Sequence, residues 1–204
     1  MRFLLMLAAV LALAAPAGAQ TPPAPDTRAL LAANTRPFQL TAAGIEGPGA
    51  DFLLAQTQDA QFVLLGEAHH DRDLPAFAGA LFGRLQREHG YRYLVVEQDP
   101  LAIEAVNASR GDLGQIVALA KRYPPHIGFA SDPDLRLLAE VAKTSRPGDP
   151  AIWGLEQAQG ATRYLEELVT LAPTPIFRTL AQQLHDEAKA KETRAAQGAF
   201  LHDD

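Results

Sequence analysis

The spacing of hydrophobic residues changes twice between residues 62 and 97, and each change predicts a new element. Residues 62–65 ("FVLL") form a short continuous apolar run that stops at Gly66. A run of this length is typical of a β-strand that is covered on both faces. A second run, "YRYLVVE" at residues 91–97, has the same character. We therefore predict strands over residues 62–67 and 91–97.

The residues between these two runs have helical spacing. Pro75 suits the first turn of a helix, and Gly90 suits the position just past its last turn. The apolar side chains recur three and four positions apart along one face: Phe77, Leu81, Phe82 and Leu85. A helix over residues 75–89 between two strands makes a βαβ unit, so we expect the two strands to be parallel.

The rest of the chain repeats this alternation. "AIWGLEQ" at residues 151–157 predicts a third strand, again apolar until a glutamate. Periodic segments before and after it predict helices on both sides of Arg110–Gly111, over 133–145, over 161–171 and over 175–197. The fold class is therefore α/β, a parallel sheet with βαβ units flanked by helices. Three strands make a small sheet, so we expect the domain to be incomplete, a fragment of a larger one.

The first 44 residues do not belong to this pattern. Residues 1–19 have Arg2, an apolar stretch and a final "AGA", which is the layout of a secretory signal peptide. An uncleaved anchor is the alternative, although the apolar stretch is short for a membrane span. Residues 20–44 are rich in Pro, Ala and Thr and indicate a tether with one short helix. The α/β domain then covers residues 45–204, and we expect it to be truncated at its C-terminus.

Composition narrows the class of protein. The chain has 204 residues, of which 48% are hydrophobic and 21% charged, as in ordinary globular proteins. Its net charge is −6 and it has no run of Lys or Arg, so we expect no nucleic-acid partner. It has no cysteine, so its stability must come from the core. We expect a periplasmic or secreted protein without a stable membrane span after signal cleavage, acting on a small-molecule substrate.

Ionisable residues follow each predicted strand at its carboxyl end. The strands end in Glu67, Glu97 and Glu156, and the first is followed at once by His69 and His70. In a parallel sheet all carboxyl ends lie at one edge, where ligands bind. The predicted fold therefore brings these five side chains together, and we expect the carboxylates of Glu67 and Glu97 to lie within about 8 Å of each other.

Such a cluster can activate water or hold a metal. An imidazole next to carboxylates can accept a proton from water, and the same groups suit a divalent metal ion. Adjacent residues point in different directions, so we expect only one of His69 and His70 to serve the site. His126, in the loop "YPPHIGF", is a candidate for substrate binding, and an exposed loop histidine is the alternative. For each of the three glutamates the alternative is a structural role, in which the side chain caps a helix or pairs with an arginine.

The motifs resemble those of a known family. "VLLGEAHH…GYRYLVVEQDPLAIEAV", followed by "WGLEQ", resembles the erythromycin esterase-like family and its wider superfamily with the Tiki proteases and ChaN-type haem-uptake proteins. The resemblance covers roughly residues 45–160. The first motif has G-E-x-x-H spacing through His70 and G-E-x-H spacing through His69. Esterase members are longer than this chain and contribute a further histidine from a late segment.

The resemblance implies a hydrolase. In the esterase branch a histidine activates water, and glutamates orient and stabilise the reacting groups. The resemblance therefore implies these catalytic residues: Glu67, His70, His69, Glu97 and Glu156. No cofactor is required in that interpretation. The alternatives are a divalent metal or haem, as in the Tiki and ChaN branches, with Glu67, His69, His70 and Glu97 as the candidate ligands, and an inactive relative.

Overall fold

The computed structural model describes residues 26–41, 44–69, 71–157 and 160–196. The chain divides into two units, residues 1–35 and 36–204. In the first unit, helix α1 (Thr27–Asn34) is capped by the carboxylate of Asp26 and has no buried residue. This confirms the short helix expected in the tether, whereas the predicted signal peptide at residues 1–19 lies outside the described residues.

The second unit begins with a small hairpin packed on a helix. Strands β1 (Gln39–Thr41) and β2 (Gly44–Glu46) pair in antiparallel fashion and are followed by helix α2 (Pro48–Thr57). Helix α3 (Leu74–His89) has proline in its first turn and ends at Gly90 with a φ of 72°, as the sequence predicts. The sequence did not reveal the pairing of β1 with β2, because strands of three residues are too short to show alternation.

Three helices follow, and each starts at the capping residue that its sequence offers. Helices α4 (Pro100–Ala108), α5 (Leu113–Arg122) and α6 (Asp132–Ala142) are capped by the side chains of Asp99, Asp112 and Ser131. A 3-10 turn, η1 (Pro124–His126), lies between α5 and α6. The predicted break at residues 110–111 is confirmed, since both residues have positive φ.

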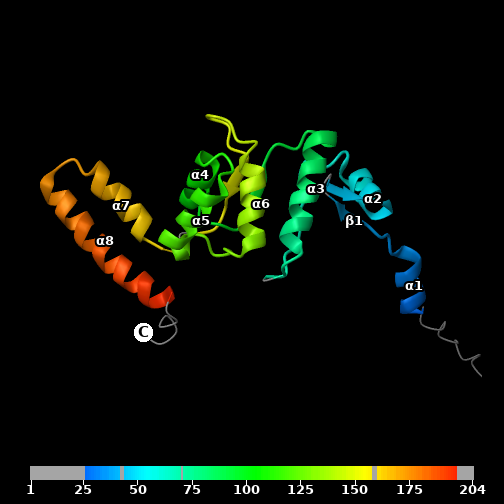
Figure 1. Cartoon of the computed structure of the whole chain (residues 1–204), viewed down its shortest axis with the longest axis horizontal. Helices are drawn as coiled ribbons and strands as arrows, with labels where there is room; N and C mark the ends of the chain where they lie inside the picture. The colour runs from blue at the N-terminus through cyan, green and yellow to red at the C-terminus, as the bar shows by residue number, and fades with distance from the viewer. Residues whose placement is uncertain (1–25, 42–43, 70, 158–159, 197–204) are drawn as a thin grey trace, which may run out of the picture. The chain divides into compact units, whose positions relative to one another are not determined.

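The second unit also contains a pair of parallel strands. Strand β3 (Leu94–Val96) pairs with β4 (Ile152–Gly154), with Leu94 opposite Ile152, and α4, α5 and α6 make the connection between them (Figure 1). The parallel orientation predicted for the second and third strands is confirmed. The main core joins α3, α4, α5 and α6 to β4 through apolar side chains that include Phe82, Ile103, Ile116, Leu138 and Ile152.

The prediction of a strand over residues 62–67 is wrong. Residues 62–67 pair with no strand, so the described sheet that contains β3 has two strands and not three. The side chains of Phe62 and Leu64 are 77% and 95% exposed, whereas a central parallel strand would be buried on both faces. An apolar run shows only that its side chains are suited to a core, and here a cavity occupies the space next to the free edge of β3.

A buried asparagine takes the place of a strand at the other edge of β4. The amide of Asn107 donates to the carbonyl oxygen of Ile152 (2.9 Å) and its oxygen accepts from the amide of Ile152 (3.2 Å). The same oxygen accepts from the hydroxyl of Ser145 (2.6 Å). One side chain thus satisfies both backbone groups that a neighbouring strand would otherwise pair.

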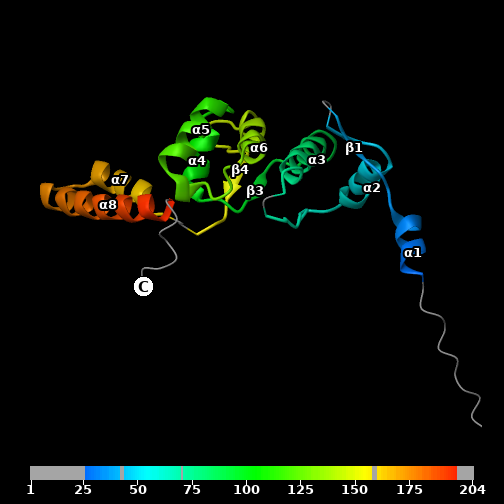
Figure 2. The ribbon, with the colours of Figure 1, turned by 60° about the horizontal axis from the view of Figure 1, so that its bottom comes forward.

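The described chain ends in a helical hairpin. Helices α7 (Thr162–Leu171) and α8 (Pro175–Ala196) lie side by side (Figure 2), and the carboxylate of Glu192 on α8 accepts from the backbone amides at the start of α7, including that of Thr162 (2.9 Å). None of the helices in the described ranges is long and apolar enough to cross a membrane.

Glu166 ties the hairpin to the end of α5. Its carboxylate accepts from Arg122 (2.5 Å) and from the hydroxyl of Tyr123. Burial raises the pKa of Glu166, but these two hydrogen bonds and the charge of Arg122 outweigh burial and leave its pKa below the ordinary value. Burial and the neighbouring carboxylate raise the pKa of Tyr123. These contacts therefore favour the ionised form of Glu166.

Candidate functional site

The carboxyl ends of β3 and β4 are joined beyond the strands themselves. The amide of Leu155 donates to the carbonyl of Val96 (3.0 Å), and the amide of Glu156 donates to the carbonyl of Gln98 (3.1 Å). Glu97, Gln98 and Asp99 follow β3 directly. These residues form what we call the carboxyl edge of the sheet.

Gly154 permits this close approach. A Cβ atom at this position would lie 2.5 Å from the carbonyl oxygen of Gln98 and 3.0 Å from the Cα atom of Pro100. A side chain here would push the turn after β3 away from β4. The absence of a side chain at Gly154 therefore positions the residues that follow β3.

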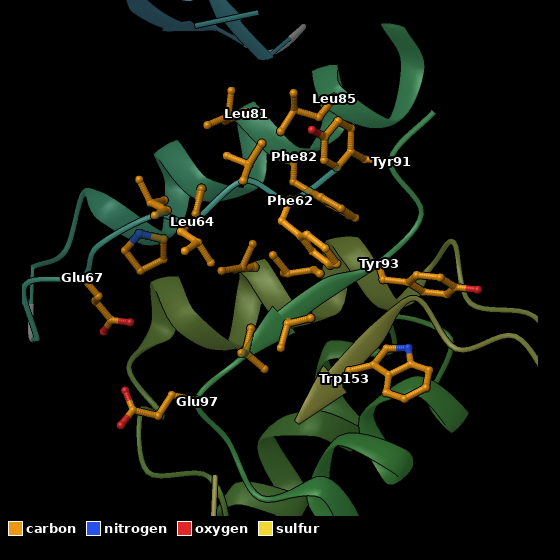
Figure 3. Close-up of a pocket in the computed structure, with 18 of the residues that line it drawn as sticks. Phe62, Leu64, Glu67, Leu81, Phe82, Leu85, Tyr91, Tyr93, Glu97 and Trp153 are labelled. Carbon is orange, nitrogen blue, oxygen red and sulfur yellow. The ribbon is translucent and has the colours of Figure 1, made fainter. Parts of the chain in front are cut away.

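A first cavity, of about 910 Å³, lies on the free side of β3. Figure 3 shows aromatic and aliphatic side chains around it, with Glu67 and Glu97 at one end and Tyr93 and Trp153 at the other. Its walls come from the unpaired segment 61–65, from α3 and from β3. The cavity is thus mostly apolar, with two carboxylates at the carboxyl end of β3.

Glu67 and His69 form a pair at this end of the cavity. Nδ1 of His69 lies 3.5 Å from a carboxylate oxygen of Glu67, and both side chains are about half exposed. The imidazole stacks on the ring of Phe129, with 4.8 Å between centroids and 11° between planes. The structure therefore brings Glu67, His69 and Glu97 to one cavity, while His70 lies outside the described residues.

A second cavity, of about 870 Å³, lies on the other side of Glu97. Glu97, Gln98 and Phe129 line both cavities. The buried side chain of Gln98 accepts from the amide of Gly128 (2.9 Å) and donates to the carbonyl of Phe129 (3.4 Å). Gln98 therefore attaches the loop after η1 to the end of β3 and sets the boundary between the cavities.

His126 lines the second cavity and is buried, with 1% of its surface exposed. The alternative of an exposed loop histidine is wrong, because the imidazole packs beside the rings of Tyr123 and Tyr164. Its Nδ1 lies 3.4 Å from Oδ2 of Asp99, and neither side chain has exposed surface. Its Nε2 has no hydrogen-bond partner among the described residues.

Asp99 has three partners. Its Oδ1 accepts from the backbone amide of Ala102 (3.0 Å), which caps α4, and its Oδ2 accepts from the hydroxyl of Tyr164 (3.0 Å) and faces His126. Burial raises the pKa of Tyr164, and the hydrogen bond to Asp99 and the charge of that carboxylate raise it further. Sequence reasoning missed Asp99. Its position as a helix cap directly after a strand end was the signal that could have indicated it.

The second cavity is acidic and partly apolar. Its carboxylates come from both strand ends and from α8: Glu97, Asp99, Glu156, Glu187 and Glu192. Lys191 is the cation among the lining residues, and Leu165, Leu184 and Phe129 are apolar. Such a lining repels anions and accommodates uncharged or cationic molecules. Glu156, predicted for the same site as Glu67, lines this cavity and not the first.

The described residues contain no group of three or more His, Cys, Asp or Glu arranged to hold a metal ion. Comparisons with known protein families, with curated proteins and with solved structures found no match for this chain. The resemblance to the erythromycin esterase-like family therefore stays a prediction.

Proposed function

We propose that the protein is an exported hydrolase that cleaves esters or lactones with water activated at the carboxyl edge of the sheet. The observation that carries this proposal is the convergence of the Glu67–His69 pair and Glu97 at one end of an apolar cavity. An apolar cavity with a few polar groups at one end is the usual form of a small-molecule site. Export is inferred from the layout of residues 1–19.

In this proposal His69 accepts the proton of the attacking water. Its Nδ1 faces Glu67, so its Nε2 is the nitrogen that serves as base. Glu97 orients the water from the end of β3, and His70, at the G-E-x-x-H position, is the alternative base. Hydrolysis adds the elements of water across the acyl–oxygen bond and releases an acid and an alcohol, or one hydroxy acid from a lactone.

Ester hydrolysis tests the function itself. We expect the full chain to hydrolyse p-nitrophenyl butyrate or γ-valerolactone, and replacement of the working base, His69 or His70, by glutamine to lower kcat/KM about 10²-fold or more. His185→Gln, on α8 away from the first cavity, is the matched control. No hydrolysis of either probe by the folded protein would refute the proposal, and equal activity of both histidine variants and the control would refute the site.

Haem binding is the second candidate. The observation in its favour is an apolar cavity of about 910 Å³ with the half-exposed imidazole of His69 at one end. Haem bound through this imidazole would give a Soret band on addition of haemin, and His69→Gln would remove it. An unchanged spectrum of haemin in the presence of the protein would exclude this function.

A further inference from the structure

The pair Asp99–His126 has a feature that its structural role does not explain. Asp99 caps α4 and receives the hydroxyl of Tyr164, so its carboxylate is satisfied. His126 is held through Nδ1, but its Nε2 is buried without a protein partner in the described ranges. A buried polar atom that lacks a hydrogen bond costs about 1–3 kcal/mol. Such an atom in a native structure calls for an explanation, such as a bound water, ion or ligand or a catalytic role.

Nε2 lies next to a part of the cavity wall that carries no side chain. Gly160 lines the second cavity, and a Cβ atom built on it would lie 3.0 Å from Nε2 of His126. The same Cβ atom would lie 2.8 Å from a carboxylate oxygen of Glu192. Any residue larger than glycine would therefore close the space in front of the imidazole.

The carboxylate of Asp99 determines which nitrogen of a neutral His126 carries the proton. Asp99 can only accept hydrogen bonds when it is ionised, so a neutral His126 presents Nδ1–H to Asp99 and leaves a lone pair on Nε2. An aspartate that orients a histidine in this way is the arrangement that makes imidazole a general base. Asp99 is here a positioning residue, since it acts through His126.

We propose that Asp99 and His126 form a second site, in which Nε2 accepts a hydrogen bond from an uncharged or cationic ligand with an apolar body and an O–H or N–H group. The ligand class follows from the acidic lining of the second cavity and from its apolar residues, such as Leu165 and Leu184. This binding site does not depend on the proposed hydrolysis.

The tautomer of His126 tests the site without any turnover. In protein labelled with ¹⁵N-histidine, with the His126 signals assigned by their loss in His126→Gln, we expect Nδ1–H and an unprotonated Nε2 at pH 7. Asp99→Asn keeps the helix cap, because asparagine caps as well as aspartate. Its amide N–H then faces Nδ1 and reverses the tautomer to Nε2–H. A wild-type Nε2–H form, or a doubly protonated ring, would overturn the site.

Binding of simple probes tests the ligand class. We expect phenol, which is neutral and donates an O–H, to shift the ring nitrogen signals of His126 saturably. Benzoate has a similar apolar body but a negative charge, and we expect it to leave these signals unchanged. A lack of saturable change with phenol, or an equal response to benzoate, would overturn the proposed ligand.

Discussion

Replacement of Asn107 by leucine should destabilise the protein more than a polar-to-apolar change normally does. Leucine has the same number of side-chain heavy atoms and the same branching, so the shape is largely kept while the hydrogen bonds of the amide are lost. Those bonds reach the backbone N–H and C=O of Ile152 and the hydroxyl of Ser145. All of these groups are buried, and water cannot replace the lost partner.

The magnitude follows from which groups are left unsatisfied. Ser145 keeps a bond, because its hydroxyl oxygen also accepts from the amide of Ala151 (3.0 Å). The carbonyl of Ile103, which receives the amide of Asn107 as well, lies within α4 and keeps its helical bond. Two backbone groups of Ile152 remain without a partner, at about 1–3 kcal/mol each. Burial of the apolar leucine offsets part of this, so we expect a loss of about 3 kcal/mol.

Urea unfolding measures this loss. With a slope of about 2 kcal/mol per molar urea, the midpoint of Asn107→Leu should fall by about 1.5 M. Glu104→Leu, at an exposed position of the same helix, is the control and should change stability by less than about 0.5 kcal/mol. A loss below about 1 kcal/mol for Asn107→Leu, or one equal to the control, would show that this asparagine does not act as the edge partner of β4.

Two further changes test the elements around the site. Glu166→Gln should lower the free energy of unfolding by about 1 kcal/mol. The pKa of Glu166 is lowered in the folded protein, so the ionised carboxylate stabilises the fold. The difference from the wild type should therefore be complete above about pH 5 and shrink as the pH falls below about 4. A difference that stays constant from pH 7 to pH 3 in thermal unfolding would contradict this assignment. Gly154→Ala should cost about 2 kcal/mol, because its Cβ atom would meet backbone at 2.5 Å, whereas Gly128→Ala, with no atom within 4 Å, should be close to neutral. Similar losses for both glycines would contradict the close approach.

The helices were predictable because their signals are local. Pro75 and Gly90 mark the ends of α3, and the break between α4 and α5 lies where the sequence places Arg110–Gly111. Caps and helical spacing act between residues at most four positions apart. These contacts can therefore be predicted from residues that are close together in the sequence, without knowledge of distant residues.

The candidate site was predictable only in part. The glutamates at the ends of the second and third strands follow β3 and β4, because these strands pair in parallel as their apolar runs indicated. The run at residues 62–65 is also apolar, but it pairs with no strand in this structure. An apolar run reports a tendency toward burial, but pairing requires a backbone edge at the right distance, which depends on the packing of other elements.

The sequence by itself thus determined the helices, the parallel pair and the residues that follow each strand. Only the tertiary structure decided that His126 is buried and that Asp99, 27 positions earlier, is the carboxylate that faces it. The same holds for Asn107, which meets β4 across 45 positions. A polar side chain in the core is stable only if a partner from elsewhere in the chain reaches it, and no local pattern records where that partner will come from.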